Sequence, residues 1–193
     1  MMTRRRGAEL DAAIRSAVLD LLAGHGPEAV TMDAVAVAAG TSKPVLYRRW
    51  PDRRALLRDT LMAVASTSFP RPDTGTFRGD LLGVLRAWAQ LFTGDTGPLM
   101  RSVIVAVASD PDLESTFLSD VLGMRKAEMT TLIGRAVERG EVRPDVPVEL
   151  VRELGQSVLW HRLLITGDPI TDELVTQLVD EVLIPVTRPY YDQ

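Results

Sequence analysis

The stretch TMDAVAVAAGTSKPVLYRRWPDRRALL, residues 31–57, holds two short helical patterns that are separated by a single glycine, Gly40. Thr31 precedes the first pattern, where its hydroxyl can accept a hydrogen bond from the free amides of a helix over Met32–Ala39. Gly40 can adopt the positive φ that a tight turn requires. The first half of the stretch is therefore predicted to be a short, capped helix that ends in a turn.

The second pattern begins after Thr41 or Ser42, either of which can cap it, and it carries Pro44 in its first turn. It is expected to end near Arg49, just before a Trp-Pro pair that breaks the helical pattern. Two short helices joined by a glycine-containing turn of roughly three or four residues form a helix-turn-helix. In that motif the N-terminal part of the second helix enters the major groove of DNA.

Apolar spacing indicates which side of this helix pair is buried. Val35, Ala38 and Leu46 are expected to point inward. Small side chains would let the two helices approach closely, namely Ala34, Ala36 and Ala39. An alternative interpretation is an ordinary Ala-rich helical hairpin with a solvated basic face, because charge runs on helices are usually solvated.

The opposite face carries side chains that can bond phosphate or base edges, namely Ser42, Lys43, Tyr47, Arg48 and Arg49. Lys43 is placed to reach guanine O6 and N7, and the methyls of Val45 can meet a thymine methyl. Arg53 and Arg54 open the following helix, where side chains and free backbone amides can hold phosphate. Together these residues predict a DNA-binding surface.

The stretch resembles the DNA-binding region of the tetracycline-repressor (TetR) family of transcription regulators. That family pattern has a Thr-led helix, a Gly-Ser turn, Leu-Tyr, a basic residue, an aromatic residue and a Lys-Glu-x-Leu-like helix start. The matching residues are Thr31, Gly40, Ser42, Leu46, Tyr47, Arg49, Trp50, Arg53, Leu56 and Leu57. The resemblance covers roughly residues 9–62, with two departures. Trp50 stands where Phe is common, and Arg53-Arg54 replaces the usual Lys-Glu pair.

The resemblance also implies roles for individual residues. The expected contacts to the DNA backbone come from Thr31, Tyr47, Arg49 and Arg53. The residues expected to face or flank bases are Ser42, Lys43, Pro44, Val45 and Arg48. For Tyr47 an alternative remains open, in which the ring packs against the first helix and only the hydroxyl reaches DNA.

Helical periodicity continues through the rest of the chain, which has no clear run of alternating β-branched residues. The predicted class is all-α: an N-terminal three-helix helix-turn-helix DNA-binding domain, joined through a fourth helix to a helical ligand-binding and dimerisation domain. The domains are expected at residues 1–66 and 67–193, because residues 66–76 are rich in Pro, Gly, Ser and Thr. Further helices are expected over 8–23, 53–65 (capped by Asp52), 77–92, 99–108, 111–139, 148–166 and 171–183, the last ending before Pro185.

Charge is distributed unevenly along the 193 residues, whose net charge is −4. Residues 1–66 carry ten Lys or Arg and seven Asp or Glu, a net of +3, whereas residues 67–193 carry twelve and nineteen, a net of −7. This distribution of charge favours residues 1–66, and not residues 67–193, as the site of any nucleic-acid contact. The run Arg4–Arg6 is either a flexible arm that touches DNA or an inert tail.

The amino-acid composition indicates the class of protein and its location in the cell. The 46% apolar and 25% charged content is that of an ordinary globular protein, and no apolar run approaches the roughly 20 residues that span a bilayer. The first ten residues lack the apolar core of a secretory signal, and the absence of Cys fits a reducing cytoplasm. We therefore expect a cytoplasmic protein with no membrane association.

The last two helices, near residues 148–166 and 171–184, are expected to form a homodimer interface, since the resemblance implies a four-helix bundle across a two-fold axis. Their apolar stripes contain Leu150, Leu154, Val158, Leu159, Leu163, Leu174, Leu178, Val182 and Leu183. Alternatively, these stripes fill the core of a monomer. A two-fold dimer would present two recognition helices to a pseudopalindromic operator.

A small-molecule effector is expected to bind among large apolar side chains of the C-terminal part. The candidates are Trp88, Phe92, Met100, Phe117, Met124, Met129 and Trp160. Aromatic and Met side chains that line a gap between helices suit a bulky apolar ligand, although such residues are more often plain core.

Other function classes fit less well. The chain has two His, no Cys, no phosphate-cradling Gly loop and no H-E-x-x-H motif, so neither an enzyme nor a cofactor or metal site is expected. A helical interaction module would bind DNA weakly and without sequence preference. The favoured interpretation is a sequence-specific DNA-binding transcriptional regulator, a ligand-responsive repressor that acts as a homodimer.

Overall fold

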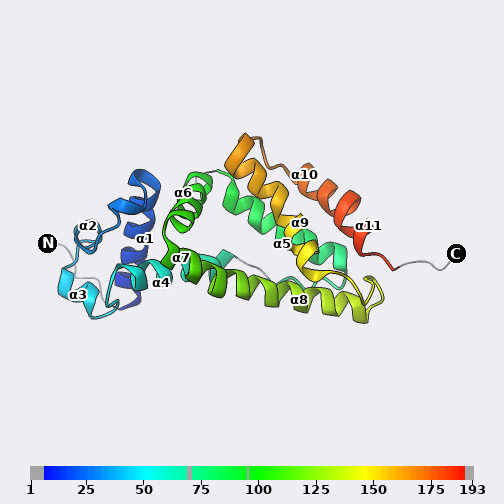
Figure 1. Ribbon diagram of the computed structural model, residues 1–193, viewed down its shortest axis with the longest axis horizontal. Helices are drawn as coiled ribbons and strands as arrows, with labels where there is room; N and C mark the ends of the chain where they lie inside the picture. The colour runs from blue at the N-terminus through cyan, green and yellow to red at the C-terminus, as the bar shows by residue number, and fades with distance from the viewer. Residues whose placement is uncertain (1–6, 69–70, 95, 190–193) are drawn as a thin grey trace. The chain divides into compact units, whose positions relative to one another are not determined.

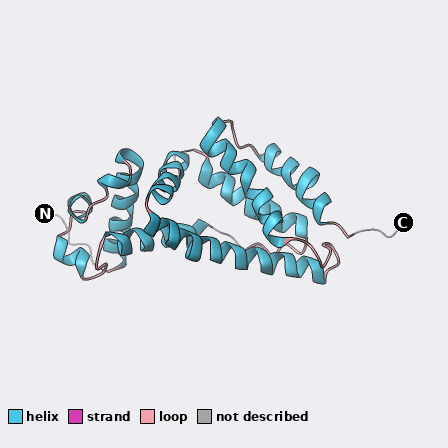
Figure 2. Cartoon of the chain, viewed as in Figure 1, coloured by secondary structure: helices cyan, strands magenta, loops and turns pink. Residues whose placement is uncertain are grey.

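The computed structural model describes residues 7–68, 71–94 and 96–189, and within these ranges all regular structure is helical, as the sequence predicts (Figures 1 and 2). The run Arg4–Arg6 lies outside the described residues. The chain divides into two compact units. The first comprises Met1–Ala65 with Pro98–Asp120, and the second comprises Ser66–Gly97 with Val121–Gln193. The predicted domain at 1–66 thus corresponds to most of the first unit, to which residues 98–120 also belong.

The N-terminal part of the first unit is a small helical bundle. It contains α1 (Ala8–His25), a 3₁₀ turn (Pro27–Ala29), α2 (Met32–Ala38), α3 (Lys43–Tyr47) and α4 (Arg53–Ser68). Helix α1 packs against α2, and α2 packs against α3. The fully buried side chains at their centre are Ile14, Val18, Leu22, Val35, Leu46, Leu56 and Leu57. The same unit also takes up most of α6 (Thr96–Ser109) and α7 (Pro111–Thr116).

Three predicted features of the helix ends are confirmed. The Thr31 hydroxyl accepts a hydrogen bond from the Ala34 amide at 3.1 Å, and the Asp52 carboxylate accepts one from the Ala55 amide at 2.7 Å. Gly40 has a φ of 64°, in the left-handed region where a side chain would be strained. The two side chains satisfy amides that the helices themselves leave free, and Gly40 allows the short turn between α2 and α3.

The second unit is a separate helical bundle. Its helices are α5 (Phe77–Phe92), α8 (Gly123–Glu138), α9 (Val148–His161), α10 (Asp172–Gln177) and α11 (Ile184–Thr187). Helix α5 packs against α8, α9 and α10. Its bounds are those predicted, with the Thr76 hydroxyl accepting from the Gly79 amide at its start.

Two helix predictions need correction. Residues 111–139 do not form one regular α-helix, because a π-helical turn at Phe117–Leu122 separates α7 from α8. The last helix does not stop before Pro185, which instead lies in the first turn of α11, after a π-helical turn at Leu178–Leu183. Leu183 and Ile184 have helical dihedral angles, so the helical backbone continues through Pro185 and ends after Thr187. A third π-helical turn, Arg162–Thr166, extends α9.

No helix in the described ranges is long and apolar enough to cross a membrane.

Candidate nucleic-acid interface and internal pocket

The N-terminal end of α3 presents an exposed polar face. Ser42 is the N-cap residue with extended backbone, and its hydroxyl makes no capping hydrogen bond. Lys43 and Pro44 follow it, and both are exposed, as is Arg48 at the other end of the helix. Leu46, on the opposite side of α3, is fully buried. One side of this five-residue helix is therefore anchored, while the other is open to a ligand.

Lys43 is linked to α2. Its ammonium lies 2.5 Å from a carboxylate oxygen of Asp33, and both side chains remain largely exposed. An exposed ion pair of this kind is weak, worth about 0–1 kcal/mol, so it can be exchanged for a contact to DNA. Val45 is half-buried, and Tyr47 has half of its surface exposed.

Arg49 and Arg53 hold parts of the first unit together. Arg49 donates from Nε to the Asp11 carboxylate on α1 at 2.5 Å and from a terminal nitrogen to the Val45 carbonyl at 3.4 Å. Arg53 donates to the carbonyls of Val30 at 2.7 Å and Pro27 at 2.8 Å, which lie in the connection between α1 and α2. A further nitrogen of Arg53 lies 3.3 Å from the carboxylate of Asp110. Both arginines thus brace the helix-turn-helix.

One inward-pointing residue is corrected. Ala38 is exposed, whereas Ala36 and Ala39 are buried beside the fully buried Val35. Successive residues of a helix are about 100° apart, so positions 35, 36 and 39 share one side and position 38 turns away from it. The buried side of α2 therefore includes Ala36 and Ala39 in place of the predicted Ala38.

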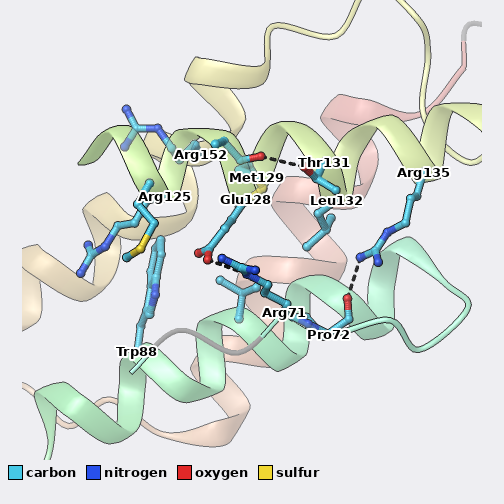
Figure 3. A pocket seen from close by; sticks show the side chains of 13 residues that line it. Arg71, Pro72, Trp88, Arg125, Glu128, Met129, Thr131, Leu132, Arg135 and Arg152 are labelled. Carbon is cyan, nitrogen blue, oxygen red and sulfur yellow. Dashed lines mark hydrogen bonds and ion pairs between the residues drawn. The ribbon is translucent and has the colours of Figure 1, made fainter. Parts of the chain in front are cut away.

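The second unit contains a pocket of about 360 Å³, seen from close by in Figure 3. Three of the seven predicted ligand-contacting residues line it: Trp88 of α5 and Met124 and Met129 of α8. Phe92 is buried elsewhere in α5, and Trp160 lies outside the lining. Met100 and Phe117 belong to the first unit, so they do not contribute to this pocket. The structure therefore brings together only part of the predicted set.

Four arginines outside the predicted set also line the pocket, namely Arg71, Arg125, Arg135 and Arg152. The guanidinium of Arg125 lies 5.2 Å from the centre of the Trp88 ring. Burial, and then the nearby charge of Arg152, lower the pKa of Arg125 to about 10, while Glu128 acts in the opposite direction. Helical spacing could have revealed part of this set, because positions 125, 128, 129, 132 and 135 lie on one face of α8.

A buried carboxylate fixes the loop beside this pocket. Asp80 of α5 is fully buried and accepts hydrogen bonds from the Thr74 amide at 2.7 Å and the Thr74 hydroxyl at 2.8 Å. Guanidinium nitrogens of Arg135 and Arg139 lie 3.6 and 3.8 Å from its other oxygen. Arg135 also donates to the Pro72 carbonyl at 2.6 Å. The wall of the pocket formed by the loop is therefore held by several polar contacts.

The N-terminal and the C-terminal parts of the chain each match a known protein family. Residues 14–60 match the family described as bacterial regulatory proteins, tetR family, and residues 71–182 match the tetracyclin repressor-like C-terminal domain. The HTH-type transcriptional regulator YdeS of Bacillus subtilis is 31% identical over 182 residues, which are 92% of each chain. The DNA-binding transcriptional repressor TetR of Mycobacteroides abscessus is 33% identical over 188 residues, covering 95% of this chain and 97% of that protein.

A solved structure extends this similarity to three dimensions. The crystal structure of the TetR family transcription regulator SCO0332 has a TM-score of 0.70 and 34% identity, and the match covers 94% of this chain and all of that one. A matched C-terminal family domain and relatives above 30% identity along nearly the whole chain establish the relationship. The chain belongs to the TetR family of helix-turn-helix transcriptional regulators, which are not enzymes.

Proposed function

We propose that the chain is a ligand-responsive repressor that binds a pseudopalindromic operator as a homodimer and reads it with α3. The observation that carries this proposal is the exposed face at the start of α3, where Ser42, Lys43 and Pro44 stand opposite the buried Leu46. The residues assigned to DNA are Thr31, Ser42, Lys43, Pro44, Val45, Tyr47, Arg48, Arg49 and Arg53. Lys43 and Arg48 carry exposed cationic groups that suit guanine edges or phosphate.

Arg49 and Arg53 serve both the protein and the DNA backbone in this proposal. A guanidinium has five N–H donors, and the hydrogen bonds and the ion pair described above use two of them in Arg49 and three in Arg53. The remaining donors can reach phosphate oxygens while the others keep the helix-turn-helix braced. Such contacts position the protein on the duplex without reading sequence.

The homodimer forms through the helical segments near residues 148–166 and 171–184. Four large apolar side chains on or just beyond these segments are exposed: Leu150, Ile165, Val182 and Val186. Of the other members of the stripes, Leu159, Leu163, Leu178 and Leu183 are buried in the protomer, whereas Leu154, Val158 and Leu174 are half-buried. Exposed apolar side chains gathered on two neighbouring segments favour an interface with a second copy. In this proposal, some residues of the stripes fill the core of the protomer, and others contribute to the dimer interface.

The pocket of the second unit is the effector site. Its volume of about 360 Å³ lies at the small end of the range of roughly 300–1,000 Å³ that ligand pockets occupy. An effector that binds more tightly to the form with low DNA affinity must, by thermodynamic reciprocity, weaken DNA binding. The protein acts on the chromosome, and we place it in the cytoplasm.

Selection of genomic fragments by the purified full-length protein tests this function. We expect enrichment of a short inverted repeat whose half-sites are about one helical turn, roughly 10 base pairs, or a multiple of it apart. Recovery of fragments with no shared sequence, together with binding that falls steeply with salt on any duplex, would instead indicate non-specific DNA binding.

A further inference from the structure

The pocket of the second unit combines an apolar lining with charges that the protein itself balances. Three of its arginines lie 3.0, 3.3 and 3.1 Å from a carboxylate oxygen, in the pairs Arg71–Glu128, Arg135–Asp73 and Arg152–Glu149. Figure 3 shows the first of these pairs. The apolar lining includes Val84, Trp88, Met124, Met129 and Leu132. A charged ligand would have to compete with these ion pairs, whereas an uncharged body can lie on the apolar lining without disturbing them.

Helix α9, beside the pocket, carries two buried polar atoms that accept or donate no hydrogen bond within the described part of the chain. They are the side-chain oxygen Oε1 of Gln156 and the indole nitrogen Nε1 of Trp160. Gln156 is only 9% exposed. Buried polar atoms nearly always have a hydrogen-bond partner, because leaving one unpaired costs free energy. An acceptor and a donor on neighbouring turns of one helix therefore point to a partner from outside the chain.

Gln156 and Trp160 continue a row of side chains that begins at the pocket. Arg152 lines the pocket, and the three residues follow one another along α9 at intervals of four. Residues four apart are neighbours on the surface of a helix, and their side chains lean toward its N-terminus. This geometry directs Gln156 toward the turn that carries Arg152, and Trp160 toward Gln156.

A close approach of α9 to α5 brings the same part of α9 to the pocket. A Cβ added to Gly155 would lie 3.5 Å from the Leu85 side chain of α5, so the helices are in van der Waals contact beside Gln156. Trp88, which lines the pocket, follows Leu85 by about one turn. The unpaired oxygen of Gln156 thus belongs to the level of the bundle at which the pocket lies.

We propose that the pocket binds a neutral, flat molecule that carries a carboxamide or lactam group, with its apolar body on Trp88. The N–H of this group donates to Oε1 of Gln156, and its carbonyl accepts from Nε1 of Trp160. A ligand without the group would leave both protein atoms unpaired, so it should bind more weakly. This inference rests on the proposed function, in which the pocket is the effector site, and it specifies the chemical class of the effector.

Three probes of one shape test the inference by isothermal titration of the full-length protein without DNA, at neutral pH. 2-Naphthamide donates and accepts, 2-acetonaphthone only accepts, and 2-naphthoate is charged. The wild-type protein should bind the amide about tenfold or more tightly than either of the others. Equal affinities for amide and ketone, a preference for naphthoate, or no binding of the amide up to about 0.5 mM would overturn the inference.

Two variants assign the hydrogen bonds. Gln156→Met removes the acceptor at equal length, and it should abolish the preference for the amide over the ketone while leaving the ketone affinity unchanged. Trp160→Phe removes the donor but keeps an aromatic ring, and it should weaken amide and ketone alike. Both are expected to fold, because each removes a buried polar atom that has no partner, and thermal unfolding verifies this. A preference for the amide that survives in Gln156→Met, or unchanged affinities in Trp160→Phe, would also overturn the inference.

Matched controls use a glutamine and a tryptophan away from the pocket. Gln90→Met changes an exposed residue of α5 outside the lining, and Trp50→Phe changes a buried residue of the first unit. Both controls should bind the three probes as the wild type does.

Operator affinity, measured separately with each probe at saturation, distinguishes this inference from the proposed function. If naphthamide binds through Gln156 while operator affinity stays the same, the amide site stands and its role as the effector site fails. If the ketone binds as tightly as the amide and weakens operator binding, the effector site stands and the amide inference fails.

Discussion

The Lys43 ammonium lies 2.5 Å from the Asp33 carboxylate, and the two residues belong to different helices of the helix-turn-helix. Asp33 stands in the first turn of α2, whereas Lys43 opens α3, the helix proposed to enter the major groove. In the free protein, the side chain proposed to read a base is therefore paired with a carboxylate of the same domain. DNA has to compete with Asp33 for this cation.

Removing that competition should strengthen DNA binding. Asp33→Asn keeps the size of the side chain but frees Lys43 and deletes a negative charge near the duplex. We expect affinity for the operator to rise by about 0.2–1 kcal/mol, the range of an exposed ion pair, and affinity for a scrambled duplex to rise less. Fluorescence anisotropy at fixed salt measures both. Asp20→Asn, an exposed carboxylate on α1, controls for net charge, and an equal gain in that variant would show that the Lys43 pair is irrelevant.

The role of Lys43 itself is tested by Lys43→Ala. If Lys43 contacts a base, the variant should lose about 1–3 kcal/mol of binding on the operator and much less on a scrambled duplex. An equal loss of binding free energy on both duplexes would show that Lys43 contacts only phosphate. Because the side chain is exposed, its removal should leave the thermal unfolding midpoint almost unchanged.

The dimer interface is tested by a charge on the exposed apolar face of α9. Leu150 is 52% exposed, and Leu150→Glu should shift the protein toward monomer in sedimentation at micromolar concentration, because the carboxylate would have to lose its water at the interface. Val105→Glu is the matched control, since Val105 is 53% exposed but lies on α6. A wild-type protein that sediments as a monomer, or a Leu150→Glu variant that remains a dimer, would contradict the proposed interface.

Acid should weaken the second unit. Arg78 and Arg86 on α5 each donate two hydrogen bonds, at 2.6 and 2.8 Å, to Asp180 and Asp172 respectively. These bonds lower the pKa of both carboxyls below the ordinary 3.8. A carboxyl with a lowered folded pKa adds stability above its unfolded pKa and loses it as pH falls through the folded value.

The urea midpoint should therefore fall as the pH is lowered below about 4, and it should fall less in the double variant Asp172→Asn/Asp180→Asn. Both carboxyls are exposed, so the difference between the two proteins is expected to be small. A double variant whose urea midpoint falls as much as that of the wild type would show that these pairs do not contribute.

Much of the helical framework follows from local sequence. The helix Phe77–Phe92 is predicted with its observed bounds, because an apolar stripe continues to Phe92. The π-helical turns, such as Phe117–Leu122, carry no comparable local signature. Likewise, the exposure of Ala38 depends on which side of α2 meets α1 and α3, and a short alanine-rich helix leaves that undecided.

The pocket was less predictable than the DNA-binding face. Large apolar side chains such as Phe92 and Met100 give the same sequence pattern whether they line a cavity or fill a core. An arginine such as Arg125 or Arg152 looks like part of a solvated face until α5, α8 and α9 pack together. The residues of α3, by contrast, are adjacent in the chain, so their order alone places them on one surface.

Helix α3 is proposed to read a defined DNA sequence. The most direct measurement is the ratio of dissociation constants for a scrambled duplex and for the selected operator, at the same length and at physiological salt. We expect the wild-type protein to bind the operator at least about 10³-fold more tightly. A ratio near one, with equal and steep salt dependence on both duplexes, would contradict it.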